Sequence, residues 1–292
     1  MQAMPTASVI RRKTASVARY GRAAAGTFWY VVVLGVLAFE LLPIAWVLLT
    51  SIKPEREFFV YPPSLMFEPT LANFASAGSQ PSFVRALVNT AVVAVVTTSI
   101  AVLLGILMAY ALARFRFPGA DVLLIAVIAT RMVPRATMLV PFFVMMGNLQ
   151  LTNTVAALVL AYSSFSLPFA VWMMYGFYLE FPVDLEDAAR VDGCSRLQAL
   201  WHISLPLVAP GVAATAILTF IYAWNEFVLA VVLAGGPART LPVYIASFVT
   251  ERETVWGDLF AVSSIAILPV FVLALLVQKH LVRGLTAGAV KG

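Results

Sequence analysis

Residues that could carry out chemistry are sparse in this 292-residue chain. The single cysteine, Cys194, allows no internal disulfide, and two histidines leave little from which to build a metal site. The one dense group of carboxylates is Asp184, Glu186 and Asp187. Acids at the start of a short helix usually stabilise the helix dipole, and we weigh this role above catalysis. No set of nucleophile, base and acid is indicated, because the two histidines lie apart at the ends of segments.

The four lysines of the chain do not form a nucleotide-hydrolysing site. The phosphate-binding loop of ATPases needs Gly-Lys followed by Ser or Thr. Only Lys13 precedes Ser or Thr, and Arg12 rather than a glycine precedes Lys13. Any ATP hydrolysis coupled to this protein must therefore come from another polypeptide.

Two arginines lie inside an apolar segment. Arg131 and Arg135 flank Pro134, and their four-residue spacing predicts that both guanidinium groups lie on one face of a helix kinked at the proline. A charge at membrane depth costs about 2.5 to 3.5 kcal/mol on insertion scales unless it faces protein or water. We therefore expect both to face inward on a substrate path, or else to reach an interface or pair with Glu226 or Glu40.

The composition is typical of an integral membrane protein. Hydrophobic residues make up 62% of the chain and charged residues 11%, with a mean hydropathy of +0.94, whereas soluble domains carry about 25% charged residues. A hydrocarbon core about 30 Å thick needs about 20 apolar residues per helix. We predict an all-α polytopic membrane protein with six transmembrane helices. The apolar segments cover residues 28–50, 86–113, about 122–146, about 154–179, about 208–233 and 259–278.

Charge sets the expected topology. The basic tail 1–27 resembles the start of a signal peptide, but the segment after it is long enough to span and lacks a small-x-small cleavage site, so we expect a retained helix. Six spans put both termini on one side, which holds twelve Lys and Arg residues against five on the other. Positively charged loops stay inside, so both termini are expected in the cytoplasm. The net charge of +5 thus reports topology rather than a nucleic-acid partner.

The polar stretch between the fourth and fifth segments, residues 180–206, carries the most information. Asp184 is a candidate N-cap, with Asp187 three residues on as in a capping box, so a helix is expected from about Leu185. Gly193 can adopt the left-handed conformation that ends a helix. A second short helical piece, residues 196–202, is expected to stop at Pro206, where the next span begins. For an arbitrary sequence this pattern favours an amphipathic linker on the membrane surface.

The spacing within this stretch resembles the EAA loop of ABC-importer permeases, which reads Glu-Ala-Ala, three residues, Gly, nine residues, Ile-x-Leu-Pro. Only the first position departs, with aspartate in place of glutamate. The resemblance implies that the loop is a coupling helix that docks into a cleft on a cytoplasmic ATPase. The matching residues are Asp187, Ala188, Ala189, Gly193, Ile203, Leu205 and Pro206.

Further segments are similar to MalG-like sugar permeases. The resemblance begins at residue 28 and implies an ABC type I importer permease (MetI-like) fold over residues 28–283, between a cytoplasmic N-terminal tail, 1–27, and a C-terminal tail, 284–292. The similar segments are residues 42–46, 50–53, 89–90, 109–114, 117–119, 224–226 and 284–292.

The resemblance implies a non-enzymatic permease subunit of an ATP-driven importer in the bacterial inner membrane. Its cargo would be a di- or oligosaccharide or a sugar derivative. The implied partners are a MalF-like second permease, an extracytoplasmic solute-binding protein, membrane lipid, and two ATPase subunits that hold ATP and Mg²⁺, while this chain binds no cofactor. An alternative is a permease for a polyol, glycerol phosphate or anionic sugar derivative, for which the paired arginines argue. More remote alternatives are an intramembrane enzyme and a stand-alone secondary transporter, which would show internal repeats and no docking loop.

Three other regions are expected to contact solute or partners. Aromatic rings stack on the C–H faces of sugars and amides bond hydroxyls, although Trp in membrane helices more often packs. By resemblance, the external loop 235–258 contacts the binding protein, and the C-terminal tail, with Gly288 and Lys291, enters the interface between the ATPase subunits. The candidate substrate path comprises Arg131, Arg135, Trp224, Asn225 and Glu226.

Overall fold

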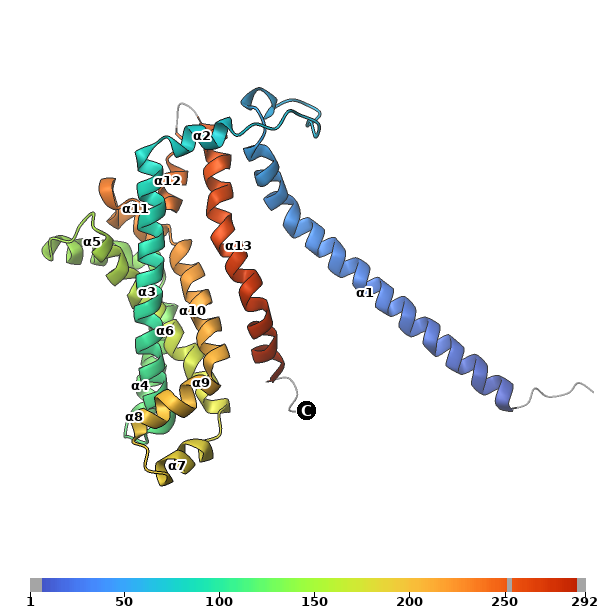
Figure 1. Ribbon diagram of the computed structural model, residues 1–292, viewed down its shortest axis with the longest axis vertical. Coiled ribbons are helices and arrows are strands. Elements are labelled where there is room, and N and C mark those ends of the chain that lie inside the picture. Colours follow the sequence, from blue (N-terminus) through green and yellow to red (C-terminus); the bar gives the residue numbers. More distant parts are fainter. Residues whose placement is uncertain (1–6, 251–253, 288–292) are drawn as a thin grey trace, which may run out of the picture. The chain divides into compact units, whose positions relative to one another are not determined.

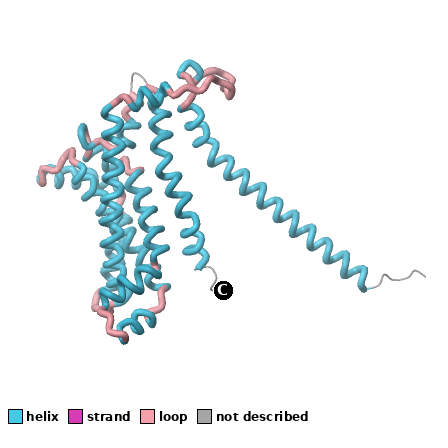
Figure 2. Tube along the Cα trace, in the orientation of Figure 1, coloured by secondary structure: helices cyan, strands magenta, loops and turns pink. Residues whose placement is uncertain are grey.

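The computed structural model describes the backbone of residues 7–250 and 254–287 and the side chains of residues 28–250 and 254–276. Helices and loops make up this part of the chain, and its only β pairing is an isolated bridge between Val249 and Thr254 (Figure 2). The chain divides into two compact units, one up to Thr70 and the other from Leu71 onward.

The first unit consists of a long helix and a loop. Helix α1 covers Ala7–Ser51, and a 3-10 turn, η1, covers Glu55–Glu57. The helix therefore starts well before Phe28, where the sequence predicted its beginning, because the basic tail is rich in Ala and Arg, two strong helix formers. After the helix, the buried Lys53 donates from Nζ to the carbonyl oxygen of Ser64 at 2.6 Å and thereby holds the loop closed.

The second unit is a bundle built around α3, α6 and α10, with α7 at one end of α3 and α2, α11 and α12 toward the other (Figure 1). Its long helices are α3 (Pro81–Arg114), α6 (Val155–Glu180), α10 (Ala209–Trp224) and α13 (Trp256–Ala287). The shorter elements are α2 (Ala72–Gly78), α4 (Ala120–Ala129), η2 (Thr130–Met132), η3 (Arg135–Met138), α5 (Leu139–Asn148), α7 (Asp184–Val191), α8 (Arg196–Ala199), η4 (Leu200–Ser204), α9 (Leu205–Leu207), α11 (Val228–Leu233), η5 (Gly236–Ala238) and α12 (Leu241–Ala246).

Four helices in the described part of the chain are long and apolar enough to cross a membrane, and two bent pairs raise the number to six if each pair is one span. The first pair, residues 120–132 and 135–148, is bent by 92°, and the second, residues 196–207 and 209–224, by 77°. The predicted number of six spans is therefore reached if each bent pair counts as one span, and the third predicted span is broken. Val133 and Pro134 are extended there because proline lacks an N–H and disfavours helix at the preceding residue.

Two other helices differ in extent from the predicted apolar segments. The fifth segment was expected to run to residue 233, but α10 ends at Trp224 and α11 begins only at Val228. The sixth helix, α13, continues to Ala287, beyond the predicted end at residue 278 and into the expected tail. Glycines are tolerated within a helix at a modest cost, so Gly284 does not stop α13.

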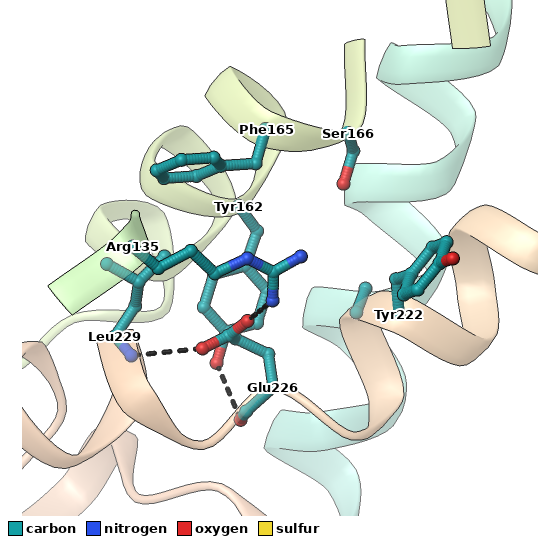
Figure 3. A pocket seen from close by; sticks show the side chains of 8 residues that line it. Arg135, Tyr162, Phe165, Ser166, Tyr222, Glu226 and Leu229 are labelled. Atoms are coloured by element: carbon teal, nitrogen blue, oxygen red, sulfur yellow. Dashed lines mark hydrogen bonds and ion pairs between the residues drawn. The ribbon is translucent and has the colours of Figure 1, made fainter. Parts of the chain in front are cut away.

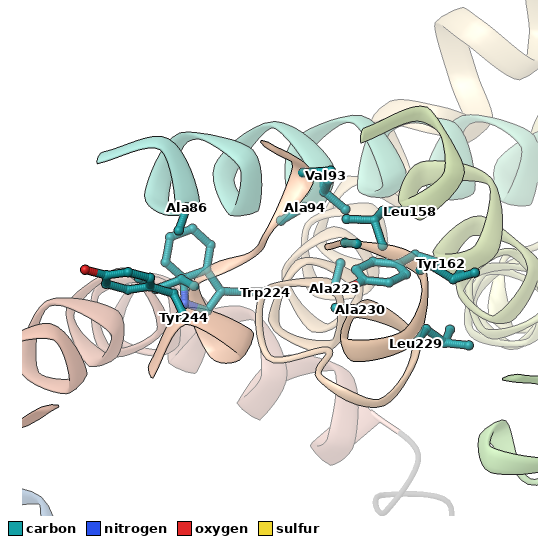
Figure 4. Packing of buried hydrophobic residues seen from close by; sticks show 14 of the residues in the cluster. Ala86, Val93, Ala94, Leu158, Tyr162, Ala223, Trp224, Leu229, Ala230 and Tyr244 are labelled. Carbon is teal, nitrogen blue, oxygen red and sulfur yellow. The ribbon is translucent and has the colours of Figure 1, made fainter. Parts of the chain in front are cut away.

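Small residues let the central helices of the second unit approach closely. A Cβ atom on Gly105 of α3 would lie 2.7 Å from the Cβ of Ala170 in α6, and one on Gly211 of α10 would lie 2.4 Å from the ring of Phe177. Such contacts are typical of membrane bundles, where packing rather than water exclusion holds helices together. The core around Leu158, Tyr162 and Trp224 fills the space between these helices (Figure 4).

Candidate functional site

The predicted coupling loop forms two short helices between α6 and α10. Helix α7 begins at Asp184, but the predicted cap was wrong: its N-cap is Val183, and no side chain caps it. The carbonyl oxygen of Val183 instead accepts the backbone N–H groups of Glu186 and Asp187, which places Asp184 inside the first turn. Its acids there still favour the helix dipole.

Gly193 ends α7 in the predicted conformation. Its φ is +95°, in the left-handed region. The N–H of Gly193 bonds to the carbonyl of Arg190 at 3.1 Å and that of Cys194 to the carbonyl of Ala189 at 3.0 Å, which is the Schellman pattern. No atom lies within 4 Å of the position that a Cβ would occupy, so glycine is needed here for its backbone freedom rather than for space.

The second piece of the loop starts at Arg196, as predicted, but its C-terminal end differs from the prediction. Ser195 and Gln198 form a capping box at the start of α8, with Ser195 N–H donating to Gln198 Oε1 at 2.8 Å and Gln198 N–H to Ser195 Oγ at 3.3 Å. The serine and glutamine three residues apart are the sequence signal for this box. Pro206 does not stop the helix: a π turn, η4, precedes it and α9 runs to Leu207. The wider turn accommodates the proline ring within the helical path.

The EAA-like residues divide between an exposed and a buried face. The Asp187 side chain is 59% exposed and pairs with Arg190 at 3.3 Å, while Ala188 is exposed beside it. Ala189 faces inward. Ile203 and Leu205 are half-buried, and Pro206 is exposed. The loop thus offers a small acidic surface around Asp187 and Ala188.

The sequence-based list missed Glu186, which is buried beside the exposed Asp187. Glu186 Oε1 accepts from Arg114 Nε at 2.8 Å, and its Oε2 accepts from the Tyr110 hydroxyl at 3.0 Å. Arg114 also donates from Nη2 to the carbonyl oxygen of Phe181 at 3.1 Å. The spacing of Glu186 and Ala189 is the signal that could have identified it, because residues three apart share a helix face.

A polar hollow lies where the broken third span meets the break between α10 and α11 (Figure 3). Arg135 forms an ion pair with Glu226, which is buried. Glu226 Oε1 also accepts the N–H of Leu229 at 3.0 Å, and its carbonyl accepts the Tyr162 hydroxyl at 3.2 Å. The lining residues are Arg135, Tyr162, Phe165, Ser166, Tyr222, Ala223, Glu226 and Leu229.

The other candidate path residues lie elsewhere. Arg131 is exposed and sits over the ring of Phe169, 4.7 Å from its centroid. It does not share a helix face with Arg135, and the prediction that it would was wrong because the helix is broken at Val133 and Pro134. Trp224 is buried and donates from Nε1 to the carbonyl of Ala266 at 3.1 Å, while the Asn225 amide bonds to Ile221.

No cluster of three or more His, Cys, Asp or Glu residues suited to a metal occurs in the described part of the chain. Gly288 and Lys291, the tail residues predicted to contact the ATPase, lie outside the described residues.

The second unit is thus an apolar helical bundle with two short helices, joined by the turn at Gly193, between α6 and α10. Residues 101–287 match the family described as binding-protein-dependent transport system inner membrane component, and the chain belongs to this family.

Several relatives of the chain are permease proteins named for the sugars that they transport. The chain is 41% identical over 254 residues to the sulfoquinovosyl glycerol transport system permease protein SmoH of Agrobacterium fabrum, covering 86% of this chain and 89% of the relative. It is 36% identical to the trehalose transport system permease protein SugB of Mycobacterium tuberculosis, with 91% and 98% covered. It is 37% identical to the trehalose/maltose transport system permease protein MalG of Thermococcus litoralis, with 86% and 92% covered.

Solved structures share the fold. One is a bacterial ABC transporter involved in the import of the acidic polysaccharide alginate, with a TM-score of 0.70 at 23% identity, covering 95% of this chain and 99% of that chain. Another is the MetNI methionine ABC transporter in an inward-facing conformation, with a TM-score of 0.53 at 19% identity, covering 68% and 92%. The predicted all-α, MetI-like permease fold is therefore confirmed.

Proposed function

We propose that this chain is the permease subunit of an ABC importer that takes up a sugar or sugar derivative delivered by a solute-binding protein. The observation that carries the proposal is the loop 180–206, whose EAA-like residues form a glycine-terminated helix with an exposed acidic surface. Similarity over 86 to 91% of the chain to permeases named for trehalose, maltose and sulfoquinovosyl glycerol supports a sugar as the cargo.

The proposed assembly contains a MalF-like second permease and two ATPase subunits that hold ATP and Mg²⁺. In it, Asp187, Ala188, Ala189 and Gly193 dock on an ATPase, while Ile203, Leu205 and Pro206 join the loop to α10. ATP-driven closure of the ATPases would move the loop as a rigid body and alternate the open side of the permease pair. This places the loop and both termini in the cytoplasm, with the loop after α11 outside.

The polar hollow at Arg135 and Glu226 is the proposed part of the solute path. In this conformation the hollow has a volume of only about 10 Å³, which is room for about one water, so a solute would pass only after the helices around it move. Phe165 and Tyr222 would then offer ring faces to a sugar, and Ser166 would offer a hydroxyl. The Arg135 charge is balanced by Glu226, which favours a neutral polyhydroxylated solute over an anionic derivative. Arg131, Trp224 and Asn225 are not included in this path, since they do not line the hollow.

The proposal is tested by expressing the chain with the neighbouring permease and ATPase genes and reconstituting the purified complex in vesicles. We expect the ATPase to copurify and loaded binding protein to stimulate both ATP hydrolysis and sugar uptake. The Asp187→Ala variant should weaken ATPase attachment. Uptake driven by an ion gradient without an ATPase would instead establish a secondary transporter.

A further inference from the structure

Helix α3 holds the coupling loop at one end and the loop after α11 at the other. We propose that α3 is a strut that transmits movement between these two loops, and that Glu186 and Arg114 at one end and Asn89 and Thr90 at the other are its positioning residues. The inference rests on the proposed function, because it assigns the route by which binding-protein docking and ATPase movement are linked.

The first joint ties α7 to the end of α3. The side chains of Arg114 and Glu186 are each only 6% exposed, so water does little to weaken their 2.8 Å pair. The Tyr110 hydroxyl, one turn earlier on α3, binds the second oxygen of the same carboxylate. Two side chains of α3 thus hold one carboxylate, and Arg114 also connects it to the end of α6 by donating to the Phe181 carbonyl.

The second joint ties the outer loop to the opposite part of α3. Asn89 Nδ2 donates to the carbonyl oxygens of Pro237 at 2.8 Å and Arg239 at 3.0 Å. The neighbouring Thr90 is buried, and its Oγ1 accepts the N–H of Leu241, the first residue of α12, at 2.7 Å. Two consecutive side chains of α3 therefore hold both ends of a short loop segment.

The part of α3 between these two sets of contacts is continuous and long enough to transmit a movement from one to the other. Thr90 and Arg114 are 24 positions apart in one uninterrupted helix, which corresponds to about 36 Å at 1.5 Å per residue. Of the other long helices, α6 and α13 contain Pro168 and Pro269 in their interiors, whereas the only proline of α3 is at its first position. Proline inside a helix removes a hydrogen bond and permits bending, so α3 is the stiffer element.

The two helices that are joined to the coupling loop in sequence, α6 and α10, are less rigid connections than α3. The loop leads into α10 through a π turn and a 77° bend, and into α6 with its internal proline. Gly105 of α3 packs against Ala170 of α6, so movement of α3 would also carry α6. Docking of the loop 235–247 on a binding protein would then change the position of α7 through α3.

The native Cys194, which follows Gly193 in the coupling loop and is partly exposed, reports on this transmission. The experiment uses the complete complex in vesicles, with cysteine-free partner subunits, and measures the rate at which a maleimide modifies Cys194 with and without loaded binding protein. We expect binding protein to change the rate several-fold in the wild type. Asn89→Ala should abolish this response, although position 89 lies far from Cys194. Ser99→Ala, an exposed hydroxyl on the same helix that bonds only within it, should retain the response.

Coupling measurements provide a second test. Glu186→Gln keeps the side-chain volume but removes the charge, and it should lower the ratio of sugar imported to ATP hydrolysed several-fold, as should Asn89→Ala. Because either change already breaks the strut, the double variant should be no worse than the poorer single variant. Asp121→Asn, an exposed carboxylate on α4, is the matched control.

The outcomes are distinct. A wild-type Cys194 response in Asn89→Ala, or multiplicative losses in the double variant, would overturn the strut. If the Glu186→Gln variant fails to assemble, the Cys194 modification rate in the Asn89→Ala variant is sufficient to test the strut. A wild-type complex without ATP-driven uptake would overturn the proposed function instead.

Discussion

Two adjacent carboxylates in α7 have opposite environments. Glu186 is buried against Arg114 and Tyr110, whereas the neighbouring Asp187 is exposed. Successive helix positions are about 100° apart, so one acid can position the loop while the next faces a partner. The shorter aspartate at the EAA-like position therefore acts at the surface, and the glutamate acts within the fold.

Substitutions at Gly193 are expected to affect transport through the backbone conformation of this residue alone. Gly193→Val forces a β-branched residue to a φ of +95°, at a cost of at least about 1 to 2 kcal/mol for an L-residue in the left-handed region. We expect membrane insertion to persist but binding-protein-stimulated ATP hydrolysis and uptake to fall. Gly193→Asn, which tolerates this region, should retain most of both. Normal uptake with valine would show that the turn is not required.

The ion pair in the hollow predicts a change in selectivity. Glu226→Gln leaves the half-exposed Arg135 without its counter-charge, so uptake of an anionic sugar derivative should rise several-fold relative to that of its neutral parent. Arg135→Gln in the same background should remove the difference. Competitive uptake of the two solutes gives the ratio. Arg131→Gln serves as the control, and a similar shift in that variant would contradict the assignment of the path to the hollow.

At the scale of elements, breaks rather than continuous helices create the sites. The extended Val133 and Pro134 bring Arg135 to the interval between α10 and α11, where Glu226 lies. Freed backbone groups inside a membrane must find partners, and Glu226 supplies one by accepting the N–H of Leu229. The broken spans are thus stabilised by the same side chains that form the hollow.

Close contact between α3 and α6 predicts sensitivity at Gly105. Gly105→Ala would place a Cβ 2.7 Å from that of Ala170 and 3.1 Å from its backbone carbon, which should destabilise the permease by about 1 to 3 kcal/mol. Thermal unfolding in detergent measures the effect. Adding Ala170→Gly should restore part of the loss. Gly176→Ala, where no atom lies within 4 Å, should leave the midpoint unchanged; an equal decrease there would indicate a general intolerance of substitution.

At the scale of the whole molecule, the second unit leaves much of its apolar helix surface uncovered. Only 17% of the most apolar window of α13 is buried. Apolar helices with so little internal packing need lipid or a neighbouring protein around them. This agrees with a second permease in the proposed assembly.

Deletion of the C-terminal end is expected to lower only the coupling between ATP hydrolysis and sugar uptake. Deleting residues 285–292 removes the last three residues described for α13 together with Gly288 and Lys291. We expect the truncated chain to insert and assemble, because the deletion leaves all six apolar segments intact, but to import less sugar per ATP hydrolysed. Vesicle uptake and phosphate release at matched expression measure this ratio. Wild-type values would assign the tail no role in coupling.

Local sequence patterns alone determined much of this protein. Apolar segment length predicted six spans, and Gly193 predicted the end of α7, because helix length and a left-handed turn depend on neighbouring residues. The EAA-like spacing also identified the loop that we propose docks on an ATPase.

Only the tertiary structure decided which polar residues meet. Glu186 and Arg114 are 72 positions apart, and Arg135 and Glu226 are 91 apart. Asn89 reaches a loop 148 to 150 positions away. Pairings at such separations depend on how helices pack and where they break, and a single sequence does not encode these as a local period. The sequence alone therefore identified the charged residues, whereas helix packing determined which of them pair. Packing also placed α3 in contact with both the loop 180–206 and the loop after α11.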